Sequence, residues 1–262
     1  MSKFSRGLVA VSLAVLTSGL TPARAASGNL PLSLCSPTDN DFVDPANLTQ
    51  PNPYFPLTTA LNGVLVGPDG DETHGLKITL GGTLLVAGVE TRIVREFEWL
   101  DINGDGRQRG SDELSVEDSF NYFAQTTSGT VCYFGEDVQL FDESGNPTGG
   151  SSGSGSWRAD GVTGCTGPEA NAPGIVMPAS PKPGMKYQQE SAPCAKDVAQ
   201  VVGVGTVTLR NGTSFPNAVR TKEGSLLESG KEYKSYAPMR GLIVDDGLQL
   251  CSPGADCSNA AG

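Results

Sequence analysis

The chain has 262 residues, of which 29 are acidic and 18 are basic, so its formal net charge is −11 at neutral pH. This acidity disfavours binding to nucleic acid and to anionic lipid, which would repel it, and it suits cations, basic partners or simple solubility. The 34 glycines and 18 prolines make long helices hard to build, which favours a β-rich fold.

The N-terminus predicts a secretory signal peptide over residues 1–25. Lys3 and Arg6 precede an uncharged apolar run, residues 7–20, and a small-x-small cleavage signal follows at residues 23–25. The apolar run is shorter than the ~20 residues of a membrane-spanning helix. We therefore expect cleavage before Ala26, export to the periplasm or the extracellular space, and no integral membrane segment in the mature chain.

The clearest predicted strand is Val89–Trp99, in which apolar and charged side chains alternate. Its expected buried face carries Val89, Thr91, Ile93, Phe97 and Trp99, interrupted only by Arg95. Its expected solvent face carries Glu90, Arg92, Glu96 and Glu98. Neighbouring carboxylates on such a strand are usually solvated, so Glu96 and Glu98 are expected to face water.

Turn residues separate the remaining β-like segments along the chain. These segments are Leu76–Leu80, Thr83–Ala87, Phe120–Gln125, Thr130–Phe134, Val138–Phe141, Thr206–Leu209, Glu232–Tyr236 and Leu242–Val244. One short helix is expected around Ala195–Val202, and long connections are expected at Gly145–Ser156 and Gly167–Met185. The pattern predicts a mainly β, single exported domain over residues 26–262, built as a curved antiparallel sheet or a partly open barrel with long loops.

Six cysteines remain in the mature chain, at positions 35, 132, 165, 194, 251 and 257. An even number in an exported chain predicts three disulfides, although six cysteines allow fifteen pairings. The favoured local pair is Cys251 with Cys257, because a Pro-Gly turn lies between them. A thiolate metal site is disfavoured because the chain has no C-x-x-C pair.

The segment from Asp101 to Glu113 carries a pattern of calcium ligands. Oxygen-bearing side chains stand at loop positions 1, 3, 5 and 12, a glycine that allows a sharp turn stands at position 6, and position 7 offers a backbone carbonyl. The predicted metal-binding residues are Asp101, Asn103, Asp105, Arg107 and Asp112. The D-x-N-x-D-G start with a twelfth-position Asp resembles the calcium loops of dockerin modules, but an EF-hand's flanking helices are absent from the pattern.

Calcium is the only cofactor that the sequence predicts. Its expected role is structural, because neutralising the loop's carboxylates would stabilise a segment that otherwise repels itself. The alternative is a polar hairpin turn whose Asp, Asn and Gly residues only satisfy turn geometry.

The sequence gives weak support for catalysis. The one histidine, His74, lies in a polar, turn-rich segment and is expected to be a solvated loop residue. The segment Gly149–Gly153 matches a serine-nucleophile motif by letters, but it lies in a Gly/Ser loop without the required strand and helix. Paired carboxylates such as Glu136 and Asp137 could act as acid and base, so a hydrolase stays open as the third-ranked function.

Aromatic residues gather in two neighbouring predicted strands. They are Phe120, Tyr122, Phe123, Tyr133, Phe134 and Phe141. A curved sheet with aromatic walls could hold a small apolar or carbohydrate ligand in its concavity, although such rings also form ordinary cores. A non-catalytic binding module is therefore the first expectation, with a structural or surface-associated protein stabilised by calcium close behind.

Five segments also resemble a group of exported bacterial β-rich proteins of uncharacterised function. They are Asn52–Thr59, Gly88–Trp99, Asn121–Phe141, Gly174–Glu190 and Glu232–Ile243. The resemblance implies a curved antiparallel sheet. It also implies that the predicted calcium loop, Asp101–Glu113, is an insertion where relatives have a short hairpin turn.

Overall fold

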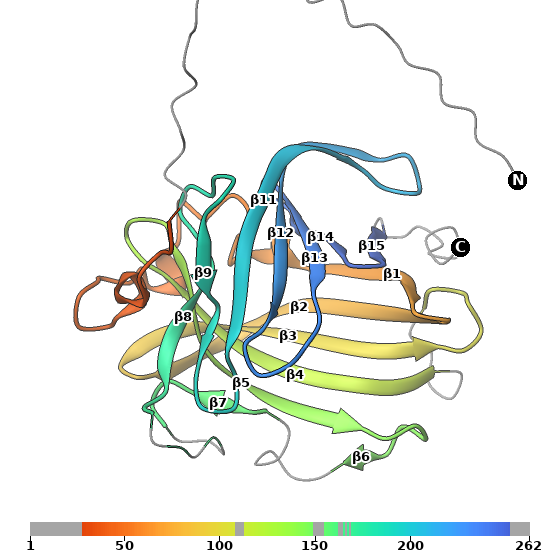
Figure 1. The fold of residues 1–262 in the computed structure, drawn as a ribbon, viewed down its shortest axis with the longest axis horizontal. Coiled ribbons are helices and arrows are strands. Elements are labelled where there is room, and N and C mark those ends of the chain that lie inside the picture. The colour runs from red at the N-terminus through yellow and green to blue at the C-terminus, as the bar shows by residue number, and fades with distance from the viewer. Residues whose placement is uncertain are drawn as a thin grey trace, which may run out of the picture.

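The computed structural model of the chain describes residues 28–107, 113–148, 155–161, 165, 167 and 169–251. Its strands form one antiparallel sheet that curls into a nearly closed barrel, as Figure 1 shows. The expected mainly β fold is confirmed. The predicted signal peptide lies outside the described residues.

Fifteen strands and three short 3-10 helices make up the described structure. The helices are η1 (Leu32–Cys35), η2 (Pro45–Asn47) and η3 (Thr59–Leu61). The first eight strands are β1 (Gly63–Asp69), β2 (Glu72–Val86), β3 (Val89–Asp101), β4 (Glu113–Gln125), β5 (Val131–Phe141), β6 (Pro147–Thr148), β7 (Trp157–Arg158) and β8 (Ala172–Met177). The others are β9 (Lys186–Gln188), β10 (Glu190–Ser191), β11 (Asp197–Thr208), β12 (Ser214–Ser225), β13 (Glu232–Ala237), β14 (Gly241–Asp245) and β15 (Leu248–Cys251).

Short hairpins build each wall of the barrel. Strands β1 to β5 follow one another in the sheet, and β15 to β11 follow in reverse order, so that β1 pairs with β15. In Figure 1, β2 to β5 run across the view while β11 to β13 run steeply against them. Neighbours in sequence are therefore mostly neighbours in the sheet, which is why alternating patterns and turn signals predicted the fold class.

The segment Lys186–Ser191 closes the barrel. Its first part, β9, pairs with β11, and its second part, β10, pairs with β8 at the other end of the sheet. The backbones approach closely here, since a Cβ atom on Gly174 would lie 2.0 Å from the carbonyl oxygen of Gln189. Gly174 is needed at this junction because any side chain would push the two edges apart.

The prediction of a short helix around Ala195–Val202 is wrong. Residues Asp197–Thr208 form β11, which pairs along its length with β12. Helix-forming residues start this segment, but β-branched Val198, Val201, Val202 and Val204 favour the extended form. The pairing partner is distant in sequence, so the local pattern could not reveal it.

The expected facing of β3 is also wrong around its middle. Val94 is fully buried and Glu96 lines the barrel interior, whereas Arg95 stacks outside on the rings of Phe97 and Phe120. The prediction assumed that the apolar face of the strand is the inner one. Here the interior is rich in carboxyl groups, so hydrophobic alternation pointed to the opposite face.

Disulfides tie the N-terminal segment and a long loop to the barrel. Cys35 on η1 is bonded to Cys132 on β5, and Cys165 is bonded to Cys194. Cys251 is also disulfide-bonded. The favoured pairing of Cys251 with Cys257 involves a residue outside the described part of the chain.

No helix among the described residues is long and apolar enough to cross a membrane.

Candidate ligand cavity and calcium loop

The barrel interior contains a cavity of about 310 Å³. Its acidic lining residues are Glu96, Glu117, Glu136, Glu190, Asp197, Glu223, Glu232 and Asp245. Lys234 is the one basic residue in the lining, and the aromatic ones are Phe55, Phe123, Tyr133 and Tyr236. Carboxyl groups and aromatic rings thus line the same partly open cavity, which is unusual for the interior of a β-domain.

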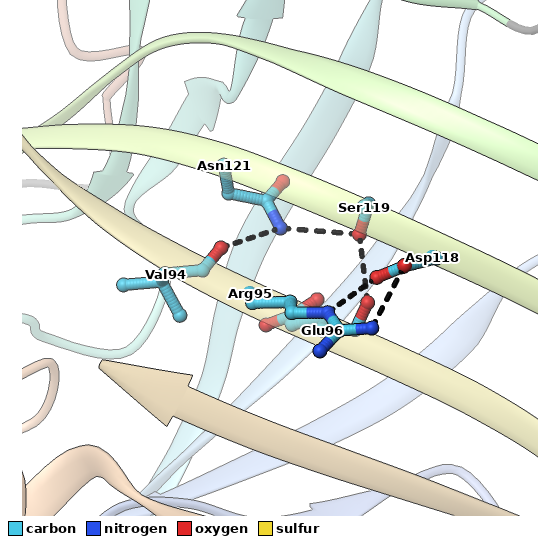
Figure 2. A network of polar contacts seen from close by, with 6 residues as sticks. All are labelled: Val94, Arg95, Glu96, Asp118, Ser119 and Asn121. Carbon is cyan, nitrogen blue, oxygen red and sulfur yellow. Dashed lines mark hydrogen bonds and ion pairs between the residues drawn. The ribbon is translucent and has the colours of Figure 1, made fainter. Parts of the chain in front are cut away.

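Alternation along β4 places one row of side chains in the cavity. Glu117, Ser119, Asn121 and Phe123 all line it. Figure 2 shows how the polar members are held: the Asn121 amide donates to the Val94 carbonyl at 3.3 Å and to the Ser119 hydroxyl at 3.2 Å. These bonds join β4 to β3 and fix the wall from which Glu117 projects.

The opposite face of the same two strands meets the outside of the barrel. There the Arg95 guanidinium donates to both carboxylate oxygens of Asp118, at 2.6 and 2.9 Å (Figure 2). Asp118 on this face is therefore paired with a basic side chain.

Only two of the six aromatic residues that the sequence placed in a ligand wall line the cavity. These are Phe123 and Tyr133, whose rings stack with centroids 4.6 Å apart. Phe55, which the sequence reasoning missed, extends the wall by an edge contact with Phe123 at 4.9 Å. Tyr236 was also missed as a lining residue because its strand comes from the far half of the chain.

The other four predicted aromatic residues do not line the cavity. Tyr122 donates a hydrogen bond to Asp137 at 2.6 Å beneath the Arg158 guanidinium. Phe134 is fully buried against Phe42 of the N-terminal segment. Phe120 is exposed, and Phe141 lies at the end of β5.

On one side of the cavity, the positive charge of Lys234 is balanced by neighbouring carboxylates. The Lys234 ammonium lies 3.2 Å from carboxylate oxygens of both Glu232 and Asp245. Burial disfavours its charged form, but the surrounding carboxylates Asp245, Glu232 and Glu223 outweigh that cost and raise the pKa of Lys234 well above its usual value. Lys234 is therefore a fixed cation whose charge is already shared by two acids.

Glu223 is satisfied by neutral donors. The Thr221 hydroxyl donates to it at 2.6 Å, the Gln189 amide at 3.1 Å and the Tyr236 hydroxyl at 3.3 Å. This network joins β12, β13 and the closing segment across the interior. It holds Gln189 and Tyr236 in place at the cavity wall.

Glu136 and Glu190 are neighbouring carboxyl groups on the opposite side, and each affects the pKa of the other. Burial, followed by the charge of Glu190, raises the pKa of Glu136 well above its usual value. Burial, followed by the charge of Asp197, raises the pKa of Glu190 to about 7. The pair therefore holds at least one proton at neutral pH, because a shared proton is the stable state of two adjacent buried carboxyl groups.

Glu96 and Glu117 extend this acidic side along β3 and β4. Burial raises the pKa of Glu96 to about 7, against the lowering effect of Lys234. Burial also raises the pKa of Glu117. Groups whose pKa values approach neutrality inside a cavity are candidates for a functional site.

A larger pocket of about 520 Å³ lies where the N-terminal segment passes β9, β11 and β12. Its lining includes Leu30, Leu226 and the basic residues Lys186, Lys222 and Lys231. Unlike the interior cavity, it brings together no set of buried carboxyl groups with shifted pKa values. The interior is therefore the better candidate site.

The predicted calcium loop forms a second cluster of acids at the ends of β3 and β4. Ligand oxygens of Asp101, Asp105 and Glu113 all lie within 4.8 Å of one another. Asp101 pairs with Glu113 across the two strands. Loop counting did not select Glu113 as a candidate ligand; it selected its neighbour Asp112, which lies outside the described residues.

The loop backbone folds around Asp101. The Gly106 amide donates to Asp101 Oδ2 at 2.8 Å, and Gly106 itself adopts a φ of +67°, as the predicted turn requires. The Asp105 amide donates to Asn103 Oδ1 and the Arg107 amide donates to Asp105 Oδ1, each at 2.9 Å. These bonds direct Asn103 and Asp105 toward the loop interior.

His74 is not the solvated loop residue that was expected. It lies on β2, is 8% exposed, and its Nδ1 is 2.7 Å from Glu98 Oε1. The hydrogen bond to Glu98 is the main cause that raises the pKa of His74, and Glu72 lies 3.5 Å from the other ring nitrogen. The sequence placed His74 in a turn because Asp and Gly precede it, but the strand begins two residues earlier.

Comparisons with protein-family models, with curated proteins and with solved structures gave no match.

Proposed function

We propose that this protein is an exported barrel that binds a small ligand in its interior without covalent chemistry and is stabilised by calcium at the Asp101–Glu113 loop. The observation that carries the proposal is the cavity of about 310 Å³, in which aromatic rings stand beside partly buried carboxyl groups. Pockets that combine apolar walls with a few converging polar groups are typical of small-molecule sites.

The interior argues against a purely structural role, the nearest alternative. Burying a carboxyl group costs stability unless it is paired, and an interior that served only packing would be apolar. Glu96, Glu117, Glu136 and Glu190 all have raised pKa values, which is the sign of this cost. A stability cost concentrated at one cavity is typical of a functional site.

The same residues define the polarity of the ligand. A purely apolar molecule would cover the carboxyl groups without offering them hydrogen bonds. This would raise the free-energy cost of removing these groups from water. A ligand with donor groups and an apolar surface suits both the acids and the stacked rings of Phe123 and Tyr133. Among the classes expected from the sequence, a carbohydrate therefore fits better than a hydrocarbon.

The loop cluster supports calcium as the stabilising ion. Asp101 is 4% exposed, and its Oδ1 atom has no hydrogen-bond partner among the described residues. An unpaired carboxylate oxygen so close to two further carboxylates destabilises the folded state unless a cation compensates its charge. Calcium prefers such oxygen ligands, and Asp101, Asp105 and Glu113 would hold it with Asn103 beside them.

Export to the periplasm or the extracellular space is supported by two features of the chain. The N-terminal sequence has the three parts of a signal peptide, and the described residues include two disulfides. Disulfides persist in oxidising compartments, where calcium is also abundant.

The proposal is tested by a ligand screen with a blocked cavity. Val176 lines the cavity, so a Val176→Phe variant would project a ring into it, whereas Val204→Phe places the same ring on the exposed face of β11. Thermal unfolding is measured with saccharides, fatty acids and amines at millimolar concentration. We expect at least one class to raise the midpoint of the wild type and of Val204→Phe but not of Val176→Phe. Equal responses in all three proteins, or none in any, would refute interior binding.

Hydrolysis is the second candidate function, and one observation favours it. Glu136 and Glu190 lie near each other and both have raised pKa values, as carboxyl pairs in acid–base catalysis can have. However, glycosidases hold their two carboxyl groups about 5 Å or more apart to admit the reacting atoms, whereas these two groups are close enough to shift each other's pKa. Turnover of chromogenic glycosides by the wild type, lost in Glu136→Gln, would favour hydrolysis over simple binding.

A further inference from the structure

The charge balance of the cavity sets the first condition on its ligand. Eight acidic side chains line the cavity against one basic side chain. That lysine, Lys234, is engaged by Glu232 and Asp245, and Glu223 is hydrogen-bonded by neutral groups. The side formed by β3, β4, β5 and β10 therefore has acids without a basic partner in the cavity lining.

The second condition comes from the aromatic wall. The rings of Phe55, Phe123, Tyr133 and Trp157 form a continuous series, with successive centroids 4.9, 4.6 and 5.5 Å apart. Trp157 also places its indole N–H 3.4 Å from Glu190 Oε1. The aromatic series thus reaches the carboxyl pair, and ring faces attract ammonium groups as well as hydrocarbon.

The volume sets the size of the ligand. The cavity of about 310 Å³ lies at the small end of the range of about 300–1,000 Å³ that is typical of small-molecule sites. It is far larger than a bare metal ion needs and suits a small organic molecule.

We propose that the interior ligand is a small organic cation, a primary or quaternary amine whose ammonium lies among Glu96, Glu117, Glu136 and Glu190 and whose carbon chain lies on the rings of Phe123 and Tyr133. This inference rests on the proposed interior binding site and specifies its ligand class. A carbohydrate would meet the hydrogen-bonding needs of the cavity but would leave its excess of acids uncompensated.

Proton release is the signature of such a ligand. Glu96 faces Lys234, Asp245, Glu117 and Glu223 from the surrounding strands, and its pKa of about 7 leaves it partly protonated at neutral pH. An ammonium beside it favours the charged carboxylate, so binding lowers that pKa and expels the proton.

The carboxyl pair adds a second source of protons. Glu190 faces Glu136 and Asp197, and its pKa of about 7 also leaves it partly protonated. Amine affinity should therefore rise as the pH rises from about 5.5 to 8, by up to about tenfold per pH unit for each proton released.

Calorimetry with matched ligand pairs tests the inference. Choline and 1,5-diaminopentane are compared with their neutral isosteres 3,3-dimethylbutanol and 1,5-pentanediol, and with simple sugars, in two buffers of different ionisation enthalpy. We expect the amines to bind at least tenfold more tightly than the isosteres, with proton release. Neutral isosteres that bind as well as the amines, or an affinity that does not change with pH, would overturn it.

Two variants complete the test. Glu96→Gln keeps the shape of the protonated side chain while removing its charge, and Glu90→Gln makes the same change on the exposed part of β3. We expect at least a tenfold loss of amine affinity in Glu96→Gln and none in Glu90→Gln, with both variants shown to be folded by their thermal midpoints. Sugar binding without amine binding would refute the organic cation and keep interior binding, whereas no binding of any class would refute both.

Discussion

Acidic residues of strand β3 lie in two regions with different surroundings. At its end, Asp101 meets Asp105 and Glu113 within 4.8 Å, in a loop whose backbone amides close around the carboxylates. Near its middle, Glu96 faces a cavity of about 310 Å³ whose acids are spread over several strands. Closely spaced oxygens suit a divalent ion, whereas dispersed acids beside aromatic rings suit an organic molecule.

The two regions also differ in how the repulsion between neighbouring carboxylates is reduced. The loop acids lie close enough together for a metal ion, if bound as proposed, to relieve their repulsion. The interior acids relieve it by holding protons, as the raised pKa values of Glu96, Glu136 and Glu190 indicate. Stability should therefore respond to calcium through the first region and to pH through the second.

The largest predicted effect is the pH dependence of stability that Glu96 contributes. Its folded pKa is raised from 4.5 to about 7, so this contribution is complete below pH 4.5 and is lost as the pH rises through 7. The shift corresponds to up to about 3 kcal/mol. In urea unfolding, the free energy of unfolding of the wild type should change between pH 4.5 and 8. In Glu96→Gln this change should be smaller by that amount.

The matched control for this experiment is Glu90→Gln, on the exposed part of the same strand. It should follow the wild-type curve. If Glu96→Gln and the wild type gave parallel curves, the interior carboxyl would not hold a proton in the folded state.

The next effect is the response of the loop to calcium. At a free calcium concentration 100 times its dissociation constant, binding to the folded state should add about 2.7 kcal/mol to the free energy of unfolding. Asp101→Asn should abolish the rise in thermal midpoint, because Asp101 is the most deeply buried carboxylate of the proposed calcium cluster. Asp71→Asn, an exposed residue in the turn between β1 and β2, should keep it.

An unchanged wild-type midpoint in EDTA and in millimolar calcium would contradict the metal assignment. In that case the loop would be the acidic turn that was the alternative prediction.

The smallest effect concerns His74, which lies on the strand next to both regions. Its pKa is raised mainly by the hydrogen bond to Glu98, so its contribution to stability is full below pH 6.5 and is lost as the pH rises through the folded pKa. His74→Gln should cost about 1 kcal/mol at pH 6 and less at pH 9. Equal losses at both pH values, measured by urea unfolding, would show that the ring contributes by packing alone.

The loop could be predicted from the sequence because its residues are neighbours along the chain. Asp101, Asn103, Asp105 and Gly106 occupy one short segment, and their spacing alone indicates an oxygen-rich turn. Glu113 was missed because it reaches the cluster through strand pairing with Asp101, which is a property of the hairpin and not of the loop spacing.

The cavity could not be predicted because its residues come from strands far apart in the chain. Glu96 and Lys234 influence each other across the barrel although 138 positions separate them. Hydrophobic alternation assumes an apolar interior, so it assigned Glu96 to the solvent face of a strand whose existence it predicted correctly. Turn and alternation signals thus indicate strands well, but they do not indicate which face of a barrel strand carries the functional residues.

The most direct test of the binding site is a carbon-13 NMR titration of the glutamate carboxyl groups, with Glu96 and Glu190 assigned from their Gln variants. An interior acidic cavity predicts that both groups titrate with midpoints near pH 7 in the ligand-free protein. Midpoints near the ordinary value of 4.5 would show that bulk water solvates these carboxyl groups, which would contradict the interior binding site.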